Sequence, residues 1–383
     1  MIFFRFRKIV VLACSVVLAG VLFLTGCQNG FEDSIRQDGL YLVSWNVQTF
    51  FDGETSGLEY SEFTGTKSEW DSTKYEKRLK NLCQAIAILD ADILVLQEIE
   101  STAVMQDIAN YLPEYMDRGK SYKWMTFGIE KDAAIGCGVF SRVPLGNTYI
   151  HQVDSRIYGE QPQLRPLVEV ELLLGDKTPR LFICHWKSKS GSEEEAFLWQ
   201  KEQELLLADC LKQLAGVSDS TVGDLDAEVS KSSIGDFDIG IADCEGDSGE
   251  IKDGHGSPTT DVTGKNIIKA TGYADGAVIC GDFNRDLEEF TLRNNRVLIG
   301  DIPVADGWLY PSVTAEGSYY YKNNWEKIDH IFTWGTVHIE SFDALTNELW
   351  TIPEGDEIIP HKYTVWKGAG FSDHLPVGAV LRF

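Results

Sequence analysis

Short apolar, β-prone runs along this chain end repeatedly in a carboxylate, amide or imidazole, and this pattern most constrains the fold. The run at 40–45 ends at Asn46, the run at 92–97 ends at Glu98, and the run at 277–280 leads into Asp282. Two further runs carry Asp329 and the pair Asp373-His374 at their ends. Because α/β proteins collect their chemistry at the ends of buried strands, we expect these distant residues to form one site.

The remaining periodicity predicts helices between some of these strands. Apolar residues recur every three or four positions from Thr73 to Leu89, which predicts a helix with one buried face. Further helices are expected at 104–112 and 193–214, and further strands at 138–141, 167–173, 180–184, 327–333 and 375–382. Since strands come both with and without intervening helices, the pattern favours a mixed sheet, or two packed sheets, over a purely parallel one.

The N-terminal segment predicts export. Basic residues precede an apolar run at 9–24, which is typical of a secretory signal and gives a predicted signal peptide over 1–26. The run closes on Leu24-Thr25-Gly26-Cys27, which resembles a bacterial lipobox with Cys27 as the lipid-modified first mature residue. The alternative is an uncleaved anchor helix. Both predict an exported protein tethered to a membrane, on its periplasmic or cell-surface face.

The rest of the chain is compatible with a linker at 27–38 and one large α/β domain at 39–383. Within it, Gly, Ser, Asp and Thr dominate the stretch at about 217–276, which predicts an acidic, partly disordered surface insertion. Its acidic clusters do not keep the EF-hand spacing of calcium loops.

Net charge and cysteines exclude some functions. A formal charge of −25 argues against tight, sequence-independent binding of nucleic acid, although a hydrolase needs only a brief contact with a phosphodiester. The cysteines beyond Cys27 show no C-x-x-C pair, which argues against a zinc site. Cys137, Cys184 and Cys280 lie in apolar runs and are interpreted as buried thiols.

Several strand-end residues suit phosphodiester hydrolysis. Glu98 is the best candidate to hold a hard divalent cation such as Mg2+, which prefers carboxylate oxygens and water. Asn46 offers a carbonyl ligand or a hydrogen bond to phosphate, and otherwise a turn. Asp282 and Asn284, one residue apart, can hold a water or a phosphate oxygen between them, or form a simple Asx-turn.

The histidines divide into candidates for catalysis and for packing. His374 suits a general base, provided that a buried carboxylate fixes its tautomer, and Asp329 is the candidate carboxylate. His330, inside a strand, is expected to be a packing residue. His185 opens a basic, hydroxyl-rich turn containing Lys187, which fits charge neutralisation on phosphate or protonation of a leaving oxygen. Arg165, before a strand, is a candidate for a bidentate phosphate contact.

Six motifs in one order carry a family resemblance: Trp45-Asn46-Val47, Leu96-Gln97-Glu98, His185, Gly281-Asp282-Phe283-Asn284, Ile328-Asp329-His330 and Ser372-Asp373-His374. This set resembles the endonuclease/exonuclease/phosphatase superfamily, with the deoxyribonuclease I-like fold. The resemblance implies a four-layered α/β sandwich, two packed mixed β-sheets flanked by helices, and a Mg2+- or Mn2+-dependent phosphodiesterase.

The resemblance also implies roles for these residues. Glu98 would be the principal metal ligand, with Asn46 and Asp373 assisting. Asp282 and Asn284 would position the nucleophile and the phosphate, and His374 with Asp329 would form the acid–base pair. Members of the superfamily differ in the group that deprotonates water, so Asp282 remains the alternative base to His374.

The choice of substrate rests on finer features. The runs at 46–52 and 185–189 resemble the exported bacterial nuclease branch, which implies an endonuclease with nucleic acid as substrate. Ile99 follows Glu98 where deoxyribonuclease I-like enzymes often carry an arginine, so a preference for double-stranded DNA is unsupported. The alternatives are a sphingomyelinase-like phospholipid phosphodiesterase and a non-catalytic lipoprotein binding module. No obligate protein partner is evident.

Overall fold

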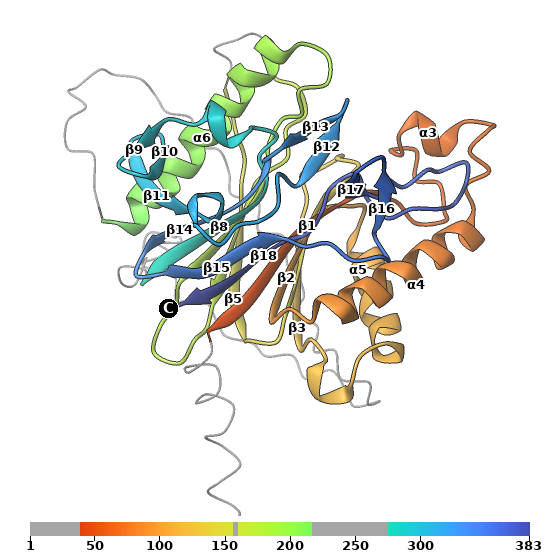
Figure 1. Ribbon diagram of the computed structural model, residues 1–383, viewed down its shortest axis with the longest axis horizontal. Coiled ribbons are helices and arrows are strands. Elements are labelled where there is room, and N and C mark those ends of the chain that lie inside the picture. The colour runs from red at the N-terminus through yellow and green to blue at the C-terminus, as the bar shows by residue number, and fades with distance from the viewer. Residues whose placement is uncertain (1–38, 156–159, 217–274) are drawn as a thin grey trace, which may run out of the picture. The chain divides into compact units, whose positions relative to one another are not determined.

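Two mixed β-sheets form the centre of the fold in the computed structural model, which describes residues 39–155, 160–216 and 275–383 (Figure 1). The described residues between Tyr41 and Phe383 form one compact unit. The predictions for the signal peptide at 1–26, for Cys27 and for the linker up to residue 38 lie outside the described residues. So does the insertion at 217–276, except for Asp275 and for Gly276, which begins a strand. No helix within the described ranges is long and apolar enough to cross a membrane.

The first sheet has six strands in the order β15-β18-β1-β2-β4-β3. These strands are β1 (Leu40–Phe50), β2 (Ile93–Ile99), β3 (Trp124–Gly128), β4 (Gly136–Ser141), β15 (His338–Ala344) and β18 (Val377–Arg382). β1 and β2 run parallel and are joined by helix α4 (Ser72–Leu89), which confirms the predicted strand–helix–strand opening. Because β18 lies beside β1, the first and last strands of the domain are neighbours.

The second sheet has eight strands in the order β5-β6-β7-β8-β14-β11-β10-β9. They are β5 (Leu145–His151), β6 (Leu167–Leu172), β7 (Arg180–His185), β8 (Gly276–Asp282), β9 (Leu292–Arg293), β10 (Arg296–Ile299), β11 (Ile302–Asp306) and β14 (Asp329–Gly335). His185 and Asp329 both lie opposite Asp282 in the register of neighbouring strands. Three predicted site residues, His185, Asp282 and Asp329, therefore lie side by side at the ends of neighbouring strands of this sheet.

The sheets pack face to face, with helices outside (Figure 1). A Cβ atom placed on Gly128 of β3 would lie 2.4 Å from the Val168 side chain of β6, so the two sheets approach closely there. Met105 of α5 (Thr102–Tyr111) packs on Gly138 of β4, and the long helix α6 (Glu193–Leu214) covers the second sheet. The predicted four-layered α/β sandwich is confirmed.

Local signals explain the long helices. α4 begins after Asp71, whose side chain accepts the Lys74 N–H, and it buries the predicted apolar stripe. α6 begins after Ser192, whose side chain accepts the Glu195 N–H, and its first turn carries three glutamates that favour the positive end of the helix dipole.

Several strands escaped the sequence prediction. β3 and β5 were not predicted, nor were most strands from residue 292 to residue 360, which include the hairpins β12 (Tyr319–Tyr321) with β13 (Asn324–Glu326) and β16 (Thr351–Glu354) with β17 (Glu357–Pro360). The two hairpins are short and partly exposed, so they lack a continuous apolar run, whereas β3 is largely buried but only five residues long. Cys137, Cys184 and Cys280 are buried and free, as expected, and so are Cys83 and Cys210.

Candidate active site

Asn46, near the end of β1, links two carboxylates that come from different sheets. Its Nδ2 donates to Glu98 Oε1 at 3.1 Å and to Asp282 Oδ2 at 3.0 Å, while its Oδ1 accepts the Gln48 N–H at 2.9 Å. The side chain is buried. A fully used amide between two carboxylates offsets their mutual repulsion and fixes their separation.

Glu98 is held by unusual backbone at the ends of β1 and β2. Its own φ is 66°, and Gln48 and Thr49 also have positive φ values of 54° and 45°. Such left-handed conformations cost non-glycine residues about 1–3 kcal/mol each and cluster at functional sites. Their effect here is to direct the Thr49 N–H to Glu98 Oε2 at 2.5 Å. The Glu98 side chain remains 15% exposed, so its carboxylate can be reached from solvent.

Arg78 of α4 stabilises the distorted backbone at residues 47–49 of β1. Its guanidinium donates to the carbonyls of Val47, Gln48 and Thr49 and lies 3.7 Å from the centre of the Tyr363 ring. Burial lowers the pKa of Arg78 to about 10, so the group stays charged at neutral pH. One buried cation thus donates to three consecutive carbonyls at the distorted end of β1, of which that of Thr49 also accepts the Phe51 N–H at 3.0 Å.

Asp282 is fixed by Asn284, which follows the end of β8 and has a φ of 48°. The Asn284 backbone N–H donates to Asp282 Oδ1 at 2.8 Å, and its Nδ2 donates to Asp282 Oδ2 at 3.0 Å and to the Trp186 carbonyl at 3.1 Å. Burial raises the pKa of Asp282 to about 7, against the lowering effects of His374, Asn284 and Asn46. The two residues form an Asx-turn, which is one of the two arrangements that their spacing predicts.

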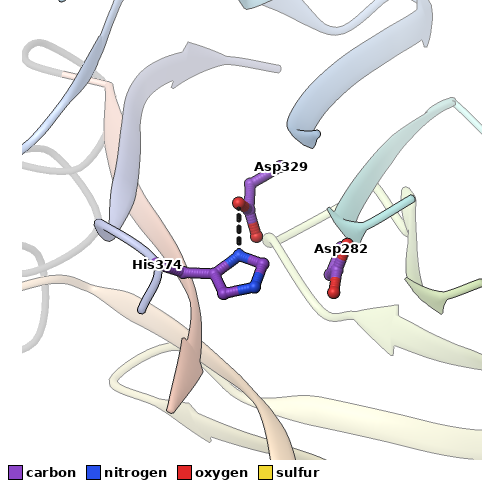
Figure 2. Close-up of side chains that lie close together, drawn as sticks. All are labelled: Asp282, Asp329 and His374. Atoms are coloured by element: carbon purple, nitrogen blue, oxygen red, sulfur yellow. Dashed lines mark hydrogen bonds and ion pairs between the residues drawn. The ribbon is translucent and has the colours of Figure 1, made fainter. Parts of the chain in front are cut away.

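His374 and Asp329 form a buried hydrogen-bonded pair, shown in Figure 2. His374 Nδ1 lies 2.8 Å from Asp329 Oδ2, and Figure 2 shows the other ring nitrogen directed toward Asp282. Burial alone lowers the pKa of His374, but Asp329, Asp282 and Asp373 outweigh it and raise that pKa to about 10. The charges around the ring therefore favour the imidazolium form rather than the neutral base expected from sequence.

The ends of the domain meet behind this pair. The Ser372 hydroxyl donates to the Asn46 carbonyl at 2.6 Å and accepts the His374 N–H at 3.0 Å. The Trp45 indole donates to the His374 carbonyl at 3.0 Å. Two of these hydrogen bonds join the segment 372–374 to β1, and the third stabilises the turn within that segment, as the convergence of the motifs predicted.

His185 faces the same carboxylates. Its Nε2 lies 3.6 Å from Glu98 Oε1 and 3.7 Å from Asp282 Oδ2, which supplies the acidic neighbours that the sequence did not reveal. Its Nδ1 is buried and makes no hydrogen bond to the described residues. Burial, with smaller contributions from Arg165 and His374, holds the pKa of His185 well below its usual value, so the ring is neutral.

Three other predicted residues lie around this centre. Asp373 Oδ2 pairs with Lys362 Nζ at 2.9 Å, and no contact among the described residues joins Asp373 to Glu98 or Asn46. Burial lowers the pKa values of His185 and Lys187, and the positive charge of Arg165 lowers both further. Lys187 Nζ contacts only the carbonyl of its neighbour Ser188 within the described ranges, at 3.3 Å.

Sequence reasoning missed the residues that support the His374 pair. The Ser318 hydroxyl donates to Asp329 Oδ2 at 2.7 Å and accepts the Asp329 N–H at 3.1 Å. The Tyr319 ring lies 4.8 Å from the His374 ring. Both come from a loop and a short strand with no apolar periodicity, so the sequence carried no signal for them. His330 packs as expected, fully buried between Asp306 and the Arg285 carbonyl.

The donors at this site fit a hard divalent cation. Ligand atoms of Asp282, Asp329 and His374 lie within 4.8 Å of one another, and Glu98 contributes a further, partly exposed carboxylate. Asp329 Oδ1 is buried without a hydrogen-bond partner among the described residues. Carboxylate oxygens with at most one imidazole are ligands that suit Mg2+ or Mn2+ better than zinc.

The chain belongs to the endonuclease/exonuclease/phosphatase family, whose model matches residues 43–374. No curated protein matches it in sequence.

Similar solved structures come from several organisms. A mannosyl-6-phosphatase of Bacteroides thetaiotaomicron VPI-5482 is 16% identical, with 90% of this chain and 100% of that one covered and a TM-score of 0.48. Truncated TDP2 of Caenorhabditis elegans is 13% identical, with 90% and 97% covered and a TM-score of 0.47. A family protein of Bacteroides thetaiotaomicron is 15% identical, with the same coverage and a TM-score of 0.47. Likenesses this distant say nothing about the reaction of this chain.

Proposed function

We propose that this protein is a divalent-cation-dependent phosphodiesterase that hydrolyses nucleic acid at the cell envelope. The observation that carries the proposal is the hydrogen-bonded series from Glu98 through Asn46 to Asp282, with the His374–Asp329 pair facing Asp282. Three carboxylates in one buried centre repel a phosphate unless a cation is bound among them. A centre of this kind therefore suits a substrate that arrives with, or after, a divalent cation.

The reaction transfers a phosphoryl group to water. A water oxygen forms a bond to phosphorus, the ester P–O bond breaks, and one proton passes from the attacking water to the leaving oxygen. A bound divalent cation would polarise the phosphoryl oxygen and neutralise the charge that develops on the leaving oxygen.

The residues of this chain orient the reacting groups and hold or move a proton. His374 Nε2, the nitrogen that Asp329 leaves open, is the atom at which the proton is held or moved. Asn284 and Asn46 fix Asp282 so that its carboxylate faces that nitrogen. Arg165 and Lys187 would neutralise the charge of the phosphate, and His185 stays neutral beside Glu98.

The location follows from the N-terminal prediction. A lipid-modified Cys27 would hold the enzyme at the envelope, since each acyl CH2 group buried in the membrane contributes about 0.8 kcal/mol to binding. Metabolic labelling of the full chain with radioactive palmitate tests this. We expect Cys27→Ser to remove the label, and labelling that persists in that variant would contradict the anchor.

One assay tests the activity. Purified protein is incubated with plasmid DNA, single-stranded DNA, RNA and sphingomyelin, each with Mg2+ and with a chelator. We expect Mg2+-dependent cleavage of nucleic acid that is lost in His374→Ala and retained in His338→Ala, a control at an exposed histidine of β15. Turnover of sphingomyelin alone would favour the phospholipid alternative. A folded protein that turns over no ester would refute the proposal in favour of a binding module.

A further inference from the structure

A cleft of about 470 Å³ opens beside Asp373. Its walls include residues of the hairpin strands β12 and β17, which pack against each other, and of the segment that follows β17. The Trp325 indole on β13 donates to Glu357 of β17 at 3.3 Å and so ties the two hairpins together. We call this region the aromatic-basic cleft, after the lining residues Tyr319, Tyr321, Lys322, Lys362 and Lys367.

The aromatic-basic cleft is continuous with the candidate active site. Tyr319 lines the cleft and also packs on His374, with 4.8 Å between the ring centres. Tyr319 and His374 are bridged through their backbones as well. Lys362, another lining residue, pairs with Asp373 next to the catalytic histidine. A chain whose phosphate lies at His374 can therefore continue over Tyr319 into the cleft.

The aromatic wall ends in an exposed tyrosine ring. Tyr319 and Tyr321 point to the same side of β12, because they are two residues apart on a strand. Their rings stack at a centre-to-centre distance of 6.1 Å and an interplanar angle of 23°. Tyr321 is 51% exposed, so the stack ends in a ring that solvent reaches. The Lys322 ammonium lies 4.9 Å from the centre of that ring, and a flat group that packs on the same face would displace this flexible side chain.

The charge of the cleft contrasts with that of the chain. Lys322, Lys362 and Lys367 line it, against the carboxylates of Glu354 and Asp373, while the whole chain carries a formal charge of −25. Lysines gathered at one point of an acidic protein favour a ligand with several negative charges. Flat rings joined by phosphates meet both requirements, since bases stack on aromatic side chains and phosphates pair with lysines.

We propose that the aromatic-basic cleft binds an unpaired base and the adjoining phosphates of single-stranded nucleic acid that extends from the scissile phosphate. This inference rests on the proposed function and narrows its substrate. In a duplex the bases stack on one another and pair, so none can cover Tyr321 until the strand opens. The cleft therefore selects single strands.

The test compares end-labelled 18-residue oligothymidylate with an abasic chain of the same length and charge, by kcat/KM at fixed Mg2+. Stacking of one base on an aromatic side chain predicts that oligothymidylate is preferred by on the order of 5- to 150-fold. Tyr321→Ala should bring the ratio of the two kcat/KM values close to one. Tyr321→Phe and Tyr321→Trp should keep the preference, and so should Tyr115→Ala, a control at another exposed tyrosine outside the cleft.

Two further readouts separate the possible failures. Lys367→Ala should reduce the slope of log KM against log salt concentration by about 0.7, the contribution of one phosphate contact on a single strand.

Equal kcat/KM values for thymidylate and abasic chains in the wild type, or a preference for duplex, would overturn the cleft proposal while leaving the proposed phosphodiesterase activity intact. If the protein binds phospholipid vesicles in a sedimentation assay and Tyr321→Ala abolishes that binding, the cleft would be assigned to a membrane instead. If no chain is cleaved, fluorescence anisotropy of labelled oligothymidylate still tests the cleft, and a binding ratio near one over the abasic chain would refute it.

Discussion

Replacing Asp329 by Asn should inactivate the enzyme while leaving its shape intact. Asp329 Oδ2 accepts from His374 Nδ1 at 2.8 Å and from the Ser318 hydroxyl at 2.7 Å, so the substitution removes a charge but no volume. Loss of one charge-assisted hydrogen bond costs about 1.5–3 kcal/mol. If the new amide turns its N–H toward the ring, His374 also adopts the wrong tautomer, and the total fall in kcat should reach about 10²- to 10⁴-fold.

The fold provides a matched control for this prediction. His330 Nδ1 lies 2.9 Å from Asp306 Oδ2 in a second, fully buried Asp–His pair. Asp306→Asn should therefore lower the free energy of unfolding by about the same 1.5–3 kcal/mol but keep kcat within about threefold of wild type. Urea unfolding and steady-state cleavage of an oligonucleotide measure the two quantities. Equal losses of kcat in both variants, or a folded Asp329→Asn with near-normal kcat, would refute the reasoning.

Further predictions concern the cation, the strained turn and acid stability. In thermal unfolding, Mg2+ at 100 times its dissociation constant should stabilise the wild type by about 2.7 kcal/mol. Glu98→Gln should abolish that stabilisation. An equal stabilisation of the variant would show that Glu98 does not bind the cation. Arg78→Met should cost at least about 3 kcal/mol in urea unfolding, because the carbonyls of Val47, Gln48 and Thr49 all lose the hydrogen bond from the guanidinium. Arg78→Lys should cost less, and a loss below about 1 kcal/mol in Arg78→Met would contradict this role of Arg78. Glu204→Gln should cost about 3–5 kcal/mol at pH 7 by leaving Arg285 buried without its partner. Burial raises the pKa of Glu204, but Lys201 and Arg285 outweigh it and lower that pKa, so the difference between wild type and variant should be constant above about pH 5 and shrink as the pH falls through the folded pKa. A difference that grows in acid would reverse that sign.

The elements that sequence predicted best have strong local signals. α4 and α6 combine a capping side chain, a long apolar stripe and no internal proline, so their bounds differ from the structure by one residue or none. β2 and β8 are continuous apolar runs and were equally visible. The hairpins β12–β13 and β16–β17 depend on contacts with each other, such as that of Trp325 with Glu357, and these leave no period in the sequence.

The residues of the site were predictable from the sequence, but the hydrogen bonds between them were not. Strand-end polar residues pointed to Asn46, Glu98 and Asp282, and the structure brings these three together. Their connection through one amide depends on tertiary geometry that residue spacing does not encode. The same holds for the positive φ of Glu98 and for the support from Ser318, because both depend on neighbours far along the chain.

The most direct test of the central claim is the position of the oxygen that enters during hydrolysis. Cleavage of a single-stranded oligonucleotide in water enriched in oxygen-18, with Mg2+, is followed by mass spectrometry of the two product ends. The account predicts one oxygen-18 atom in the product phosphate of the wild type, at least about 100-fold less labelled product in Asp329→Asn over the same time, and none with a chelator. Label in the sugar hydroxyl, or labelled phosphate formed without any divalent cation, would contradict attack by water on phosphorus at this site.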